Sequence, residues 1–194
     1  MQFEAIVLKF SGRRLSLLSK TEGRVEHHFY LQKPWMKLSS GSLVSYTQED
    51  QRGGHKKIES LSVDYVPLFC ARRDIMFLHA FLEICNFFIP EGSGGSFFYA
   101  FLISIYKHFT RFDSLYLQKR VLCKTLSHLG VYPEQRQFHS YTHILLEVPI
   151  DNLATTDLQL MKEDVFDQWL LWCIDSHPQG KWFKAMPFLL KSEK

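Results

Sequence analysis

The side chains with the clearest chemical potential lie near residue 140. His139, His143 and Glu147 recur every four residues, a spacing that places two imidazoles and a carboxylate on one face of a helix, as in a metal site. No glutamate adjoins His139 to act as a general base, and residues 144–148 favour a strand, where a spacing of four separates neighbouring groups by about 13 Å. We therefore predict no metal, no cofactor and no catalytic residue, with a metal-dependent hydrolase kept as an alternative.

Two other patterns resemble reactive sites without meeting their requirements. The four cysteines, at positions 70, 85, 123 and 173, form no Cys-x-x-Cys pair, so we expect buried, reduced thiols. The glycine-rich segment 91–96 precedes a helical pattern but lacks the Lys-Ser/Thr ending of a phosphate-binding loop. We interpret it as a linker, with Ser96 capping the helix that follows.

Cations and aromatic rings in the first third of the chain suggest nucleic-acid binding. Lys and Arg side chains contact the phosphates along a strand, and a base stacked on an exposed ring contributes about 1–3 kcal/mol to binding. The alternative is that the cations form a solvated rim and that Phe29, Tyr30 and Trp35 pack in the core or at a domain interface. The predicted nucleic-acid-binding residues are Arg13, Arg14, Lys20, Arg24, Lys33, Trp35, Lys37, Arg52, Lys56 and Lys57.

A second basic group lies further along the chain. Lys119, Arg120 and Lys124 have helical spacing and could meet an acidic partner whose apolar end is received by nearby leucines and phenylalanines. The alternative is an ordinary exposed helix face.

The elements that position these residues change character near Arg72. Before it, short alternating segments separated by polar turns predict strands over 3–10, 14–19, 24–31, 42–47 and 56–66. Five short strands in about 65 residues hide their edges best by closing into a barrel. We predict the OB type, with an SH3-like barrel as the alternative.

After Arg72 the apolar residues recur with the spacing of a helix. We predict helices from Asp74 to about Phe88, over 97–109, from Asp113 or Ser114 to Leu129 with Gly130 closing it, and over 158–174. Residues 138–148 have strand-like composition and could equally form an irregular connector. The expected fold is α+β, with an OB-type barrel domain over 1–70 and a helical domain over 71–194.

Composition limits the functional classes. With 194 residues, 46% of them hydrophobic, the chain can build a packed core, and its net charge of +3 is too small for nucleic-acid binding by charge alone. The charge is local: residues 1–72 hold eleven Lys and Arg against seven Asp and Glu, and residues 73–194 hold twelve against thirteen. The chain shows no signal peptide and no membrane-spanning run, so we expect a cytoplasmic protein.

Several strings, in this order, resemble the RecO family of bacterial recombination mediators. They are the opening strand from Phe3 to Lys9, the segment from Leu15 to Val25 across a glycine turn, the stretch from Ala71 to Gly92, and the stretch from Leu117 to Glu134 with its leucine, glycine, aromatic and proline ending. The likeness covers roughly residues 3–134. The chain departs from the family in a short turn at residues 11–13, in the absence of a basic cluster over 27–37, and in having no cysteine over 134–143 for a zinc ribbon.

The resemblance implies a non-enzymatic DNA-binding protein. Its OB fold would bind single- and double-stranded DNA, anneal complementary strands and cooperate with RecR. Its helical domain would receive the acidic C-terminal tail of the single-strand-binding protein so that RecA can be loaded. The alternative is a protein-interaction adaptor that kept this scaffold and lost DNA binding.

Overall fold

The computed structural model describes residues 1–11, 14–28, 38–50, 56–68, 72–93, 95–107, 112–153 and 162–191. The chain forms two compact units. Unit 1 comprises residues 1–69 and 85–103, and unit 2 comprises residues 70–84 and 104–194. Helices α1 (Arg72–Phe88) and α2 (Gly95–Lys107) therefore contribute residues to both units. The predicted domain boundary lies at residue 70. Residues 85–103 come after this boundary in the chain but pack with the barrel in unit 1.

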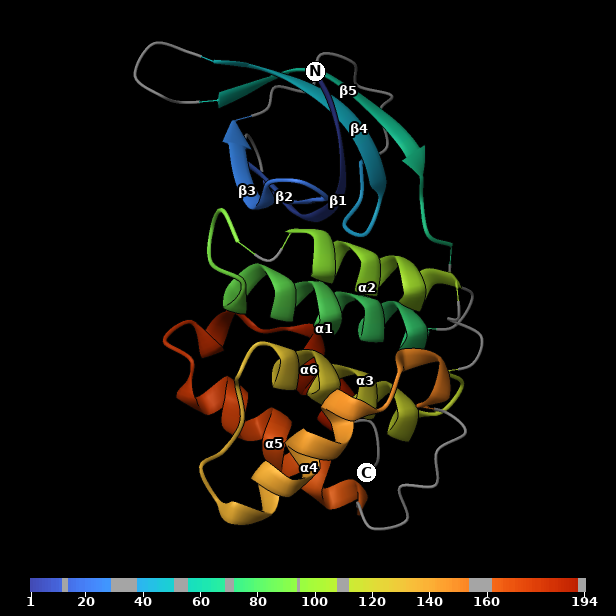
Figure 1. The fold of residues 1–194 in the computed structure, drawn as a ribbon, viewed down its shortest axis with the longest axis vertical. Coiled ribbons are helices and arrows are strands. Elements are labelled where there is room, and N and C mark those ends of the chain that lie inside the picture. Colours follow the sequence, from blue (N-terminus) through green and yellow to red (C-terminus); the bar gives the residue numbers. More distant parts are fainter. Residues whose placement is uncertain are drawn as a thin grey trace. The chain divides into compact units, whose positions relative to one another are not determined.

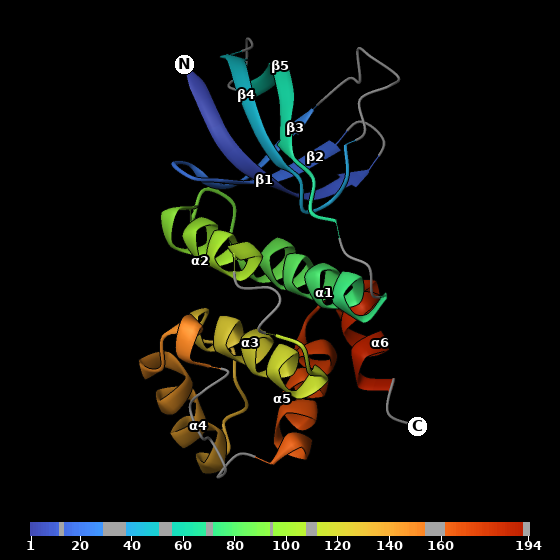
Figure 2. The same ribbon diagram turned by 90° about the vertical axis from the view of Figure 1, so that its right-hand side faces the viewer.

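Unit 1 contains a closed barrel of five strands, in the order β1-β2-β3-β5-β4 (Figures 1 and 2). Neighbouring strands are antiparallel except β3 and β5, which meet in parallel at His28 and Lys57. A barrel followed by helices confirms the predicted α+β, OB-type fold. The strands are β1 (Gln2–Ser11), β2 (Arg14–Ser19), β3 (Gly23–His28), β4 (Leu43–Asp50) and β5 (Lys56–Tyr65).

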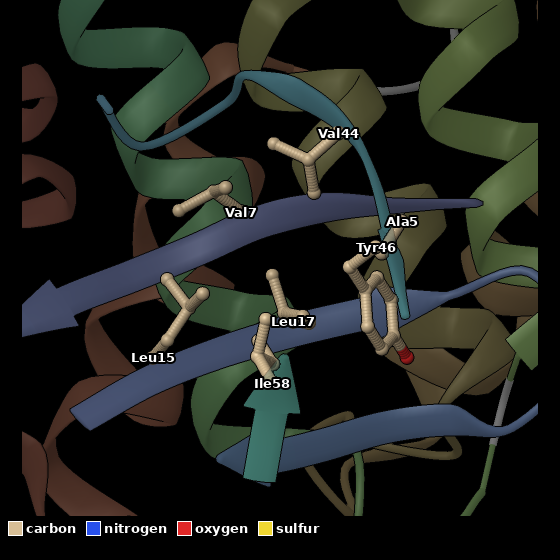
Figure 3. Packing of buried hydrophobic residues seen from close by; sticks show 7 residues of the cluster. All are labelled: Ala5, Val7, Leu15, Leu17, Val44, Tyr46 and Ile58. Carbon is tan, nitrogen blue, oxygen red and sulfur yellow. The ribbon is translucent and has the colours of Figure 1, made fainter. Parts of the chain in front are cut away.

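Alternating side chains explain why these segments close into a barrel. Inward-pointing apolar residues of four strands meet in its interior, whereas most of their outward-pointing neighbours are polar. For example, the outward Ser16 donates from Oγ to Oδ1 of Asn86 at 2.9 Å. The interior cluster comprises Ala5, Val7, Leu15, Leu17, Val44, Tyr46 and Ile58 (Figure 3).

The glycine-rich segment after α1 belongs to the barrel unit. The backbone of Arg24, in β3, donates to the carbonyl of Ser93 at 3.0 Å and accepts from the amide of Gly92 at 2.7 Å. The guanidinium of Arg24 also donates to the carbonyl of Ile89 at 3.1 Å. These bonds hold residues 91–93 against the start of β3, so this part of the predicted linker is bound to the barrel.

Unit 2 is built from helices. We predicted residues 138–148 as a strand or connector, but residues 138–147 belong to a helix and Val148 is its C-cap. Helix α2 begins at Gly95, so Ser96 is not its N-cap. A short helix over residues 185–191 lies beyond the last helix that we predicted. Beyond α1 and α2, the helices are α3 (Leu115–His128), α4 (Arg136–Glu147), the 3-10 turn Ile150–Asn152, α5 (Glu163–Ser176), the 3-10 turn Gly180–Trp182 and α6 (Ala185–Lys191).

Helix α3 shows the predicted signals at both ends. The side chain of Ser114 accepts from the amide of Leu117 at 3.2 Å, as an N-cap does. At the other end Gly130 has φ +69°, and the amides of Gly130 and Val131 donate to Ser127 and Leu126 in a Schellman motif. The ends of this helix are therefore determined locally.

The core of unit 2 is aromatic and contains one buried ion pair. Trp169 is fully buried, donates from its indole nitrogen to the carbonyl of Val131 at 3.0 Å, and meets Phe138 edge to face. Lys119 of α3 is also fully buried, and its ammonium lies 2.8 Å from Oδ1 of Asp167 in α5. This pair joins α3 to α5 across the same core.

The C-terminal end of α4 is held by a cation of α3. The ammonium of Lys124 donates to the carbonyl of Leu145, and at 3.4 Å to that of Leu146. Burial lowers the pKa of Lys124 to about 8. Burial, reinforced by the nearby Lys124, lowers the pKa of His128 to about 4. The imidazole of His128 is therefore neutral over the pH range in which an exposed histidine becomes protonated.

We expect this histidine to make stability depend on pH. The unfolded chain takes up a proton near pH 6.5, and the folded chain does so only near pH 4, so the free energy of unfolding falls as pH decreases through this window. In His128→Gln the loss should be smaller by about 1 kcal/mol, after allowance for the partial exposure of the ring. Urea unfolding at both ends of the window measures it. Identical pH dependence of the two proteins would contradict the prediction.

Candidate nucleic-acid interface

Strand pairing brings cationic residues into one row on the barrel. Ser11 pairs with Arg14, Arg14 with His28, His28 with Lys57, and Lys57 with Glu49. These five residues belong to five different strands, and we call them the cationic row. Residues directly opposite in antiparallel neighbours have Cβ atoms about 4.5–5.5 Å apart. The row therefore places side chains from separate parts of the sequence side by side.

The row points outward. Arg14 and His28 are exposed, and Lys57 is half-buried, whereas the adjacent Leu15, His27 and Ile58 are buried. The ring of His27 lies 5.7 Å from that of Tyr46. Burial raises the pKa of Tyr46 to about 12, so its phenol stays neutral in the interior. His27 and His28 thus point to opposite sides of β3.

Three chain segments adjoin the ends of the strands at the row. Residues 12–13 connect Ser11 to Arg14, residues 29–37 follow His28, and residues 51–55 connect β4 to β5. Arg13, Lys33, Trp35, Lys37 and Arg52 belong to these segments and lie outside the described residues, as does the side chain of Lys56.

Lys20 and Arg24 do not join the row. They lie by the turn at the opposite end of β2, and five strand residues at about 3.3 Å each separate that turn from Arg14. The ammonium of Lys20 lies 2.8 Å from Oε2 of Glu4, and this hydrogen bond raises the pKa of Lys20. Arg24 pairs with Glu26. Arg14 at one end of β2, and Lys20 and Arg24 at the other end, therefore form two separate groups of cations.

The three predicted partner-binding cations are not on the surface. Lys119 is fully buried, and Arg120 and Lys124 are each 3% exposed. Lys119 pairs with Asp167, and Lys124 holds the end of α4. The guanidinium of Arg120 lies over the ring of Tyr116, 5.5 Å from its centre. The expectation that helical spacing would present these residues to solvent is wrong, because their long side chains reach acceptors and rings within unit 2.

The histidines of α4 do share a helix face. His143 and Glu147 are both well exposed, with Nδ1 of the histidine 3.3 Å from Oε1 of the glutamate. His139 meets the ring of Tyr132 edge to face at 5.0 Å. In the part of the chain that the structure describes, no three histidine, cysteine or acidic side chains come together as a metal site.

The described cysteines are structural. Cys85, Cys123 and Cys173 are free thiols with no exposed surface, as we predicted, and Cys70 lies outside the described residues. Burial raises the pKa of each thiol, so none of the three is a ready nucleophile.

Two exposed residues near the row, Lys9 of β1 and His28 of β3, are not among the predicted nucleic-acid-binding residues. Lys9 pairs with Ser16, two positions along β2 from Arg14. Strand alternation places His28 on the outer face, opposite the buried His27, whereas Lys9 reaches the outer face through the register shift in β1 between Val7 and Lys9.

The comparisons with known proteins add no family. No family model matches the chain, and a search of curated proteins finds no significant match. Among the described helices, none has the length and apolar character needed to cross a bilayer.

Proposed function

We propose that this protein is a non-enzymatic, DNA-binding mediator of recombination and repair, similar to the RecO family, and that the cationic row is part of its DNA-binding surface. The observation that carries the proposal is the register of the closed barrel, which aligns Arg14, His28 and Lys57 on its outer face. Five-stranded OB barrels bind oligonucleotides. Outward cations such as Arg14 and Lys57 are what such a barrel needs to contact a phosphate backbone.

The position of the row supports the same proposal. The three segments that carry Arg13, Lys33, Trp35, Lys37 and Arg52 all adjoin it in the chain. The row thus joins the described cations to the segments in which the sequence places the remaining cations and Trp35, a ring for base stacking.

The partner roles rest on the sequence resemblance. We propose that the protein acts in the cytoplasm with RecR, and that its helical residues receive the acidic tail of the single-strand-binding protein so that RecA can be loaded. Because Lys119, Arg120 and Lys124 are buried, the tail must use other cations. Exposed candidates include Lys181, whose ammonium lies 5.7 Å from the ring centre of the exposed Trp182.

The decisive experiment measures binding to a fluorescent single strand over a range of salt concentrations. In Arg14→Ala/Lys57→Ala we expect about tenfold weaker binding at low salt. We also expect the slope of log K against log salt to fall by about 1.4, that is, by about 0.7 for each phosphate that is no longer neutralised. Lys20→Ala is the matched control, because Lys20 lies at the other end of β2 and pairs with Glu4. Equal slopes in the wild type and the double variant would contradict the proposed surface.

A second candidate function is a protein-interaction adaptor on the same scaffold. It is favoured by the carboxylates beside the candidate cations, since Lys20 pairs with Glu4, Arg24 pairs with Glu26, and Glu49 stands opposite Lys57. The same experiment separates the two functions, because an adaptor would show no salt-dependent binding of the single strand. Retained binding of the tail peptide would then support the adaptor.

A further inference from the structure

His28 occupies the centre of the cationic row. It is opposite Arg14 on β2 and is paired in parallel with Lys57 on β5. Its ring is on the exposed outer face, whereas His27 fills the interior. An imidazole is the side chain whose charge changes most readily near neutral pH. The row therefore contains two permanent cations with a titratable group between them.

The charged groups around His28 form a nearer set of cations and a more distant set of carboxylates. The direct neighbours on both adjoining strands are cations, Arg14 and Lys57. The carboxylates are one position further away. Glu26 lies two residues earlier on β3 and pairs with Arg24, Glu59 lies two residues beyond Lys57, and Glu49 lies across Lys57 on β4.

We propose that His28, when protonated, is a third phosphate contact of the row, so that this surface binds polynucleotide with uptake of a proton. The inference rests on the proposed function and goes beyond it, because it assigns His28 a role and makes affinity depend on pH. Phosphates placed along the row favour the charged imidazolium over the neutral ring. Binding and protonation therefore assist each other, and affinity rises as pH falls.

The test is binding of the fluorescent single strand at about pH 8 and about pH 5.5, on either side of the usual imidazole titration. We expect the wild type to bind about five- to tenfold more tightly at the lower pH, and most of this gain to vanish in His28→Gln, which keeps a polar side chain without the charge. His28→Lys should bind at about pH 8 as tightly as the wild type does at about pH 5.5.

The control is His143→Gln, which removes another exposed histidine, located in unit 2 and paired with Glu147. It should keep the full pH dependence of the wild type. If His28→Gln also keeps it while binding persists, the inference is overturned and the proposed function stands. Absence of binding at both pH values would overturn the proposed function and this inference with it.

Discussion

Replacing Asp167 by Asn should destabilise the protein by about 3 kcal/mol, because it removes the carboxylate beside a fully buried ammonium. Lys119 has no exposed surface, whereas Asp167 keeps 29% of its side chain exposed. The penalty therefore comes from the lysine, whose charge would lie in the core of unit 2 without the oxygen now 2.8 Å away. Urea unfolding of the intact chain, followed by tryptophan fluorescence, gives the change in free energy.

Two variants show whether charge or packing causes this loss. Asp175→Asn changes an exposed carboxylate of the same helix, and its effect should stay within about 0.5 kcal/mol. In Lys119→Met/Asp167→Leu both charges are gone, so the double variant should be more stable than Asp167→Asn by about 2 kcal/mol. If Asp167→Asn is as stable as Asp175→Asn, the ion pair has no structural role.

A methyl group at Gly23 should be the most costly small change in unit 1, destabilising it by about 3 kcal/mol. Gly23 has φ +80°, which disfavours any residue with a Cβ atom. A Cβ there would also lie 2.2 Å from the backbone carbonyl oxygen of Ser93, an atom that cannot rotate away. Gly23→Ala should therefore separate residues 91–93 from β3, and thermal unfolding measures the loss.

Two other glycines separate the two causes. Gly92 has φ +77° but open space where a methyl group would lie, so Gly92→Ala tests backbone strain alone and should cost about 1 kcal/mol. Gly95 has an ordinary φ, but its Cβ would lie 2.6 Å from the backbone nitrogen of Gly23, so Gly95→Ala tests close approach alone. A loss in Gly23→Ala no larger than that in Gly92→Ala would show that the close approach is unimportant.

Local sequence patterns predicted the structure correctly wherever interactions between neighbouring residues determine it. Alternation predicted the five strands because one face of each must be buried, and closure followed from the need to pair strand edges. Ser114 and Gly130 marked the ends of α3 because capping depends on backbone groups within one turn. The absence of a Cys-x-x-Cys pair predicted buried thiols, and Cys85, Cys123 and Cys173 are buried.

Two elements were missed because tertiary contacts determine them. In α4, β-favouring composition concealed a helical face on which Phe138, Thr142 and Leu145 are buried. Its final carbonyl groups are satisfied by Lys124 from another helix. In α6, the amides of Ala185 and Met186 donate to the carboxylate of Glu83, about a hundred residues earlier in the chain.

By itself, the sequence determined where polar and apolar side chains alternate, where helices can begin and end, and therefore the α+β plan, because these depend on groups a few bonds apart. Only the tertiary structure decided which charges are on the surface. Lys119 and Lys124 appear exposed by helical spacing, yet they are buried because acceptors on other helices compensate their charge. Conversely, Arg14, His28 and Lys57 are separated in sequence and become neighbours only through strand register.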